Sequence, residues 1–137
     1  MYIQNKKMIV SEVMLDTNSF PIVTKTTILK AALEKMDDFR LGIACITDNE
    51  DQLLGIITDG DVRRKLLSVQ KPLSAFFIDD AINQAIKNPI TISSDVTLID
   101  AVDLMEKKQV WDLPVVDNDK LIGLLHLHPA VKALLES

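Results

Sequence analysis

Four polar side chains of complementary chemistry lie close together between Thr58 and Arg64. Thr58 supplies a hydroxyl, Asp61 a carboxylate, and Arg63 and Arg64 two guanidinium groups. A hydroxyl residue followed three positions later by an acidic residue is typical of a capped helix start. The free N–H groups of a helix start also attract phosphate, and a carboxylate beside them can hold ribose hydroxyls. These residues therefore support two compatible interpretations, a helix cap and a nucleotide site.

The two arginines admit two interpretations of their own. The fork of donors on a guanidinium group matches the oxygens of a phosphate. The alternative is that Arg63 and Arg64 are solvated, or pair with the carboxylates of Asp59 and Glu50. The sequence alone leaves both open.

Other residue patterns give little indication of catalysis or metal binding. His126 and His128 lie two residues apart on an expected strand, but two histidines without a third ligand are weak evidence for a metal. No Ser/His/Asp or Cys/His arrangement indicates a nucleophile. The single cysteine, Cys45, excludes an internal disulfide and fits a reducing compartment. We therefore expect no catalytic residue and no metal site.

Composition restricts the class of protein. The chain of 137 residues is 47% hydrophobic, 26% charged and 4% aromatic, which predicts a packed, aliphatic core. Its net charge of −5 argues against general nucleic-acid binding, because phosphate neutralisation needs a basic face. No apolar run approaches the ~18–20 residues of a membrane span, and residues 1–10 lack a signal-peptide stretch. We expect a cytoplasmic protein with neither nucleic acid nor membrane as a partner.

The elements that must position these side chains occur twice along the chain. Four separate segments of the first half recur in the second half at an offset of 68 or 69 residues. The helical pattern from Ile28 to Met36, for example, recurs from Thr97 to Met105. An offset that holds within one residue over four segments indicates an internal duplication.

Each half predicts the same order of elements, β-α-β-β-α, after a short lead helix. Apolar residues on one face of a 3.6-residue period predict the main helix. Asp/Asn-rich turns between two apolar runs predict a hairpin, and a further apolar pattern predicts a closing helix. The lead helices are expected at 10–14 and 82–86, the main helices at 27–37 and 98–108, and the hairpins at 42–58 and 113–125.

One half alone makes a thin core, so we expect the two to pack sheet against sheet as one α+β body. We place the first repeat at residues 8–70, a linker at 71–79 and the second repeat at 80–137. Such packing leaves apolar helix faces outside, and large exposed apolar patches are usually interfaces. We therefore expect a homodimer, with these candidates for its surface: Met14, Ile82, Ile86, Leu104 and Leu135.

The duplicated motifs resemble a tandem pair of CBS (cystathionine-β-synthase) domains, which form a Bateman module. The resemblance covers residues 10–135 and is specific because the motifs are duplicated at a near-constant offset. Its hallmarks are Leu113-Pro114-Val115-Val116-Asp117 and Gly55-Ile56-Ile57-Thr58-Asp59-Gly60-Asp61-Val62. The fold that this resemblance implies is α+β, with two β-α-β-β-α CBS repeats packed sheet to sheet.

The resemblance also implies roles for individual residues. CBS pairs use a Thr-x-x-Asp motif to bind a nucleotide, which carries this role onto Thr58 and Asp61. The family wedges the base against the start of a strand, where this chain has Gly42, Ile43 and Ala44. A glycine there permits close approach, although it could equally be a turn residue. The implied nucleotide-binding set is Gly42, Ile43, Ala44, Thr58, Asp61, Arg63 and Arg64.

The second repeat departs from the family pattern. His126 stands at the Thr position and Pro129 at the Asp position, where a proline cannot hold a ribose hydroxyl. We expect Pro129 to be the first residue of the closing helix, with His128 as its cap. The resemblance therefore implies a degenerate second site, or one for a different ligand, formed by Asp112, Leu113, His126 and His128.

A finer resemblance concerns the host enzyme. Residues 58–64 and 123–128 are similar to the C-terminal half of sugar-phosphate isomerases of the arabinose-5-phosphate isomerase family. In that family a sugar isomerase domain precedes the CBS pair, and we expect that domain to be absent from these 137 residues. A similar first-repeat motif occurs in some sugar nucleotidyltransferases.

The leading interpretation is a non-catalytic regulatory module that modulates an attached or partner sugar-phosphate isomerase. Its expected regulatory ligand is AMP, ATP, or a cytidine nucleotide or nucleotide-sugar, and no cofactor is required. One alternative is a ligand-free dimerisation or interaction module. Another is the regulatory part of a sugar nucleotidyltransferase.

Overall fold

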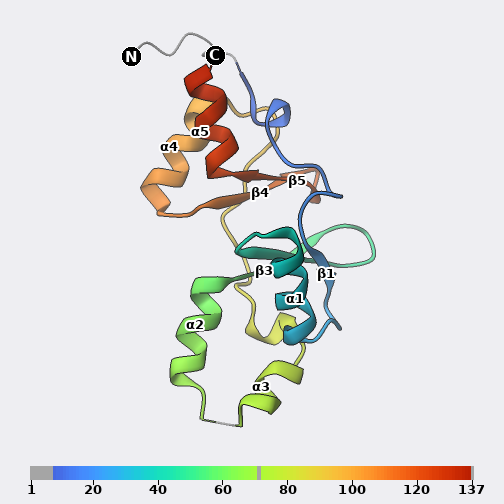
Figure 1. Cartoon of the computed structure of the whole chain (residues 1–137). Coiled ribbons are helices and arrows are strands. Elements are labelled where there is room, and N and C mark those ends of the chain that lie inside the picture. Colours follow the sequence, from blue (N-terminus) through green and yellow to red (C-terminus); the bar gives the residue numbers. More distant parts are fainter. Residues whose placement is uncertain (1–7, 71, 137) are drawn as a thin grey trace. The chain divides into compact units, whose positions relative to one another are not determined.

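The computed structural model describes residues 8–70 and 72–136 (Figure 1). The chain divides into two compact units, which we call the β1–β3 unit and the β4–β5 unit. The β1–β3 unit is contiguous and runs from Asn18 to Pro89, whereas the β4–β5 unit joins the residues up to Thr17 with those from Ile90 onward. The signal-peptide expectation for residues 1–10 falls mostly outside the described residues.

The β1–β3 unit contains a three-stranded sheet covered by helices. In the sheet, β1 (Ile22–Thr24) pairs in parallel with β2 (Ile43–Thr47), and β2 pairs antiparallel with β3 (Leu53–Thr58). The helices are α1 (Leu29–Phe39), α2 (Asp59–Ser68) and α3 (Leu73–Ile78), with a short 3₁₀ helix η2 (Ala81–Gln84). Helix α1 lies against α3 (Figure 1). Its buried Leu29, Ala32 and Met36 join Phe76 of α3 in one apolar cluster.

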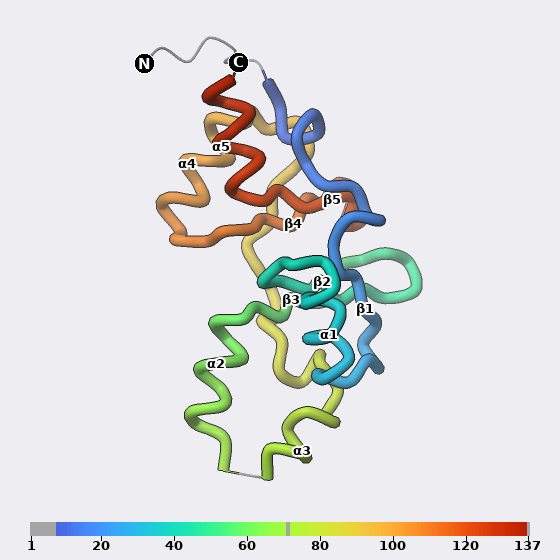
Figure 2. The backbone as a smooth tube through the Cα atoms, in the orientation of Figure 1, coloured from blue at the N-terminus to red at the C-terminus, as the bar shows by residue number. Residues whose placement is uncertain are grey.

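The β4–β5 unit is built around an antiparallel hairpin of β4 (Asp112–Asp117) and β5 (Lys120–His126). Helices α4 (Leu98–Lys108) and α5 (Leu127–Glu136) lie side by side (Figure 2). The 3₁₀ helix η1 (Val10–Glu12) contributes Val10, which is completely buried in the apolar cluster of this unit.

The duplication extends to details of the backbone. Helices α1 and α4 both end in a residue with left-handed conformation, Arg40 (φ 57°) and Gln109 (φ 55°). Both hairpins carry a register shift, at Ile46/Thr47 and at Val115/Val116. The α+β fold class, the hairpins and the main helices predicted from the sequence are therefore confirmed.

The short lead helices are present as 3₁₀ helices, whereas two other expectations differ. The first strand of the second repeat is reduced to one isolated parallel bridge between Ile92 and Val115, so β-α-β-β-α is complete only in the first repeat. The segment 71–79, expected as a linker, contains α3, because Phe76 is buried and anchors a helical turn against α1.

Each hairpin pairs with a lead segment that belongs to the other sequence repeat. Ile56 of β3 exchanges two backbone hydrogen bonds with Ile86 (3.0 and 2.9 Å), and Leu124 of β5 exchanges two with Leu15 (2.8 and 3.0 Å). A glycine precedes each of these two strand residues, Gly55 before Ile56 and Gly123 before Leu124. A Cβ on Gly55 would lie 2.8 Å from the Ile86 carbonyl oxygen. The glycines are therefore needed because backbone approaches backbone at these points.

The apolar residues expected on a dimer surface are only partly exposed. Ile86 and Leu135 are exposed by 39% and 53%. Met14 and Leu104 are half-buried and pack against the core of the β4–β5 unit, and Ile82 packs against that of the β1–β3 unit. Of the five, Ile86 and Leu135 therefore offer the most free surface. Among the described residues, no helix combines the length and apolarity needed to cross a membrane.

Candidate functional site

Antiparallel pairing of β2 with β3 brings two of the predicted binding segments together. Ile43 lies opposite Thr58 in the register, and the amide of Asp59 donates to the carbonyl of Gly42 at 3.1 Å. The side chains of Ile43 and Ala44 are buried in the unit and do not reach solvent. Gly42, which is half-buried, is therefore the most accessible of the three residues predicted at this strand start.

Thr58 caps helix α2 and fixes the neighbouring carboxylate. Its hydroxyl oxygen accepts from the Asp61 amide at 3.3 Å, and its O–H donates to Asp61 Oδ2 at 2.6 Å. The helix-cap interpretation of this pair is thus confirmed. Because the carboxylate is held by the cap, it presents its second oxygen in a defined direction beside the first turn of α2.

Arg64 occupies that second oxygen. Its guanidinium group donates to Asp61 Oδ1 at 2.6 Å, with the Arg64 side chain 62% exposed and Asp61 20% exposed. Residues three apart face the same side of a helix, whereas Arg63 is two positions from Asp61 and points elsewhere. The alternative pairing of Arg64 with Asp59 or Glu50 is therefore wrong, and Arg63 forms no ion pair within the described residues.

The electrostatics of the cluster keep Asp61 ionised. Burial, the largest influence, raises the pKa of Asp61. The hydrogen bonds from Thr58 and Arg64 and the charges of Arg64 and Lys65 together outweigh it, so that the pKa of Asp61 lies below its ordinary value. A hydrogen-bond acceptor of full negative charge thus stands at the start of α2.

The sequence interpretation missed the position of Asp59 beside the site. A Cβ placed on Gly42 would lie 2.9 Å from Asp59 Oδ2, so the Asp59 carboxylate covers this glycine. A Cβ on Gly60 would lie 3.3 Å from a guanidinium nitrogen of Arg64. The register of the hairpin could have indicated this position, because it places Gly42 next to Asp59, the residue after Thr58. Two carboxylates and one guanidinium group therefore surround the helix start.

The corresponding position of the second repeat holds a histidine–aspartate pair. His126 and Asp112 lie opposite each other in the register of β4 and β5, and His126 Nδ1 is 2.7 Å from Asp112 Oδ1. Burial raises the pKa of Asp112, and the hydrogen bond with His126 opposes this only in part. Leu113, predicted with this site, is completely buried. His126 and Asp112 thus satisfy each other by a hydrogen bond. Leu113, which was predicted with them, is a core residue.

His128 and Pro129 lie differently from the prediction. Helix α5 begins at Leu127, whose amide donates to the Trp111 carbonyl at 2.9 Å, so His128 is helical and does not cap it. Pro129 is the third helical residue, where no intrahelical N–H partner is lost. The rings of His126 and His128 meet edge to face at 5.4 Å although only His126 is on the strand. Within residues 8–70 and 72–136, no group of three or more potential ligands could hold a metal.

Comparison with known proteins agrees with this architecture. The model of the CBS domain family matches the chain twice, over residues 10–68 and 80–135. The arabinose 5-phosphate isomerase KdsD of Francisella tularensis is 34% identical over 125 residues, which are 90% of this chain and 36% of the isomerase. The chain thus spans about a third of the length of the curated relatives it matches.

Solved structures show the same fold. The crystal structure of CBSX2 in complex with AMP superposes with a TM-score of 0.82 at 25% identity, covering 94% of this chain and 97% of CBSX2. The CBS domain pair of MJ0100, in complex with 5′-methylthioadenosine and S-adenosyl-L-methionine, has a TM-score of 0.76 at 18% identity and covers 94% and 97%. With two family matches, the repeated hairpin-and-helix units and these superpositions, the chain belongs to the CBS domain family, as a tandem CBS pair.

Proposed function

We propose that this CBS pair is a regulatory module that binds a nucleotide at the first repeat, through Thr58, Asp61 and Arg64. The observation that carries the proposal is the arrangement at the start of α2. There, an ionised carboxylate in the first turn of the helix is held by the cap hydroxyl and stands beside a guanidinium group. These are the groups that ribose hydroxyls and phosphate oxygens require.

Each part of the ligand has a matching group. Asp61 would accept hydrogen bonds from the ribose, and Arg64 would meet the phosphate. The backbone at Gly42, Ile43 and Ala44 would face the base, as the family resemblance implies. The AMP held by CBSX2 and the adenosyl ligands held by MJ0100 support an adenine nucleotide. A cytidine nucleotide or nucleotide-sugar is the second ligand class that we propose.

Titration calorimetry with AMP, ATP and CMP tests this function. We expect one of the three to bind with one site per chain. Mass spectrometry of small molecules that co-purify with the chain would identify a ligand outside this set. If no nucleotide binds and none co-purifies, the proposal is wrong.

The proposed target of regulation is a sugar-phosphate isomerase, attached or separate. This rests on the likeness to KdsD, of which the chain matches about a third. Regulation requires that the ligand binds two states of the module with different affinity. We place this module in the cytoplasm, with repeats at 8–70 and 80–137 joined through 71–79, and without catalytic activity. Conversion of arabinose 5-phosphate to ribulose 5-phosphate by the pure chain would contradict the proposed lack of catalytic activity. A sugar nucleotidyltransferase remains the alternative host.

One observation favours a second candidate function, a ligand-free interaction module. The cluster is already occupied by its own side chains, because Thr58 and Arg64 both bond to Asp61 and the Asp59 carboxylate covers Gly42. Thermal melting separates the two functions. A regulatory module should melt at a higher temperature when millimolar nucleotide is added, since a ligand that binds only the folded state stabilises it. An interaction module should not respond.

A further inference from the structure

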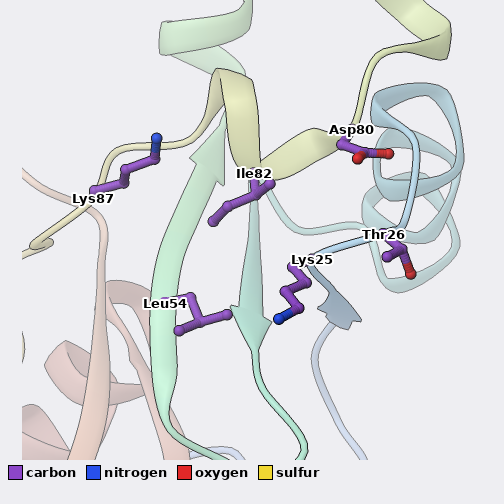
Figure 3. A pocket seen from close by; sticks show the side chains of 6 residues that line it. All are labelled: Lys25, Thr26, Leu54, Asp80, Ile82 and Lys87. Carbon is purple, nitrogen blue, oxygen red and sulfur yellow. The ribbon is translucent and has the colours of Figure 1, made fainter.

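A separate pocket lies on the β1–β3 unit, at the end of the sheet opposite the Thr58–Asp61 cluster. The register places Ile43 next to Thr58 at one end, and Thr24, Thr47 and Leu53 at the other. The pocket has a volume of about 490 Å³, within the range of small-molecule sites. Its lining residues are Lys25, Thr26, Leu54, Asp80, Ile82 and Lys87 (Figure 3).

Backbone hydrogen bonds fix the frame of this pocket. The loop after β1 is tied to the segment before η2, because the Ala81 amide donates to the Thr27 carbonyl and the Leu29 amide to the Asp79 carbonyl, both at 2.8 Å. The other end of that segment is tied to β3 by the pair Ile56–Ile86. The pocket walls are thus preformed, which reduces the ordering cost of binding.

The lining combines an apolar surface with two cations. Leu54 and Ile82 provide the apolar part, and the Lys25 side chain extends toward the Leu54 side of the pocket (Figure 3). The carboxylate of Asp80 is turned to the side on which Thr26 lies, away from Lys87 (Figure 3). Neither Lys25 nor Lys87 forms an ion pair within the described residues. With two lysines and one aspartate, the lining carries a net positive charge on a chain of net charge −5.

We propose that this pocket binds a small organic anion, a molecule with one carboxylate or phosphate group on an apolar body. The apolar body lies against Leu54 and Ile82, where burial of its surface drives binding. The anionic group pairs with the ammonium group of Lys25 or of Lys87, which lie on different sides of the pocket (Figure 3) and provide compact point charges. This site is independent of the nucleotide site proposed above, and shares none of its residues.

The test uses 8-anilinonaphthalene-1-sulfonate, an apolar anion whose fluorescence rises on binding. We expect binding to perturb the backbone amides of residues 25–28, 54–56 and 80–87 in a ¹⁵N–¹H correlation spectrum. The variant Lys25→Gln/Lys87→Gln should bind about tenfold more weakly or worse, because charge-assisted contacts are lost. Leu54→Gln, which removes apolar surface at similar volume, should weaken binding severalfold.

Two controls make the result decisive. Lys108→Gln/Lys132→Gln makes the same charge change in the β4–β5 unit, and Asp61→Ala alters the nucleotide site. Both should leave the affinity for the probe unchanged. Absence of binding at about millimolar probe, equal loss in the control variant, or amide shifts confined to other residues would each overturn the proposal.

Competition then identifies the anionic group. Octanoate and phenyl phosphate each carry an apolar body, and displacement of the probe by one or the other assigns a carboxylate or a phosphate ligand. If neither displaces the probe, the proposal is wrong.

Discussion

The Arg64 guanidinium group and Thr58 O–H each occupy one oxygen of the Asp61 carboxylate, at 2.6 Å in both cases. Each oxygen can accept one further hydrogen bond, but a ribose that binds to Asp61 must share the carboxylate with these donors or displace one of them. Thr58 is fixed by its position as the helix cap, whereas the Arg64 side chain is 62% exposed and flexible. If one donor is displaced, we therefore expect it to be Arg64, which would leave the carboxylate and turn to the phosphate of the proposed ligand.

Replacement of Arg64 by glutamine should change nucleoside and nucleotide binding in opposite directions. Adenosine should bind as tightly as before or more tightly, because its ribose no longer competes with a guanidinium group. AMP should bind about tenfold more weakly, because one charge-assisted contact to phosphate is lost at an exposed site. Calorimetry with both ligands gives the ratio, and Arg63→Gln is the matched control. An equal loss of affinity for adenosine and AMP would show that Arg64 only supports the local structure and does not contact the phosphate.

Removal of the Asp61 carboxylate should abolish most nucleotide binding. Asp61→Ala loses hydrogen bonds to a charged group, which corresponds to about 1.5–3 kcal/mol or roughly ten- to a hundredfold in affinity. His126→Ala, at the corresponding strand end of the second repeat, should change the affinity little. The stability of each variant is measured first by thermal melting, because Asp61 also supports the helix start. If His126→Ala abolishes binding and Asp61→Ala leaves it intact, the nucleotide-binding site is in the second repeat.

The hydrogen bonds to Asp61 should also make stability depend on pH in the acid range. The pKa of Asp61 in the folded protein lies below its ordinary value of 3.8, so the unfolded chain binds the proton more tightly. This contribution is fully present above pH 3.8 and is lost as the pH falls through the lower folded pKa. Urea unfolding of the wild type and of Asp61→Asn, between about pH 7 and pH 3, isolates it. The difference in unfolding free energy should shrink toward the acid end, and a constant difference would disprove the linkage.

Alanine substitution of two glycines should have opposite effects on stability. In Gly55→Ala the new methyl group would meet the Ile86 carbonyl oxygen at 2.8 Å, and we expect a loss of about 1–3 kcal/mol. In Gly60→Ala it would meet only the flexible guanidinium end of Arg64 at 3.3 Å. Because Gly60 lies in helix α2, the change should be neutral or stabilising by up to about 1 kcal/mol. Urea denaturation measures both, and equal losses would contradict the close approach at Gly55.

The chain should form a homodimer in which exposed leucines take part. Light scattering at high micromolar concentration should give twice the chain mass of 15.3 kDa. Leu135 of α5 is 53% exposed, and Leu135→Asp should shift the equilibrium toward monomer. Leu67→Asp, on α2, is the matched control because it places the same charge at an exposed leucine outside the predicted surface. A monomeric wild type would contradict the expectation.

Local signals predicted most of the elements correctly. The apolar periodicity around Met36 and Met105 gave both main helices, and the Asp/Asn-rich turns gave both hairpins, because these patterns depend on neighbours in the sequence. The partner of Arg64 was not predicted, since Asp59 and Asp61 are both within its reach until the helix fixes their faces. The pairing of Ile86 with Ile56 was also missed, because it joins residues 30 positions apart and has no local signature. The burial of Phe76 that turns part of the linker into α3 is likewise a tertiary effect.

The two units differ in when they can be completed during synthesis. The β1–β3 unit is one continuous stretch of chain, from Asn18 to Pro89. This unit can therefore close while later residues are still in the ribosome. Leu15, in contrast, pairs with Leu124, so its backbone groups remain unpaired until more than a hundred further residues have been synthesised. This strand-like segment is thus placed long after it is made, and during that interval it is open to other chains.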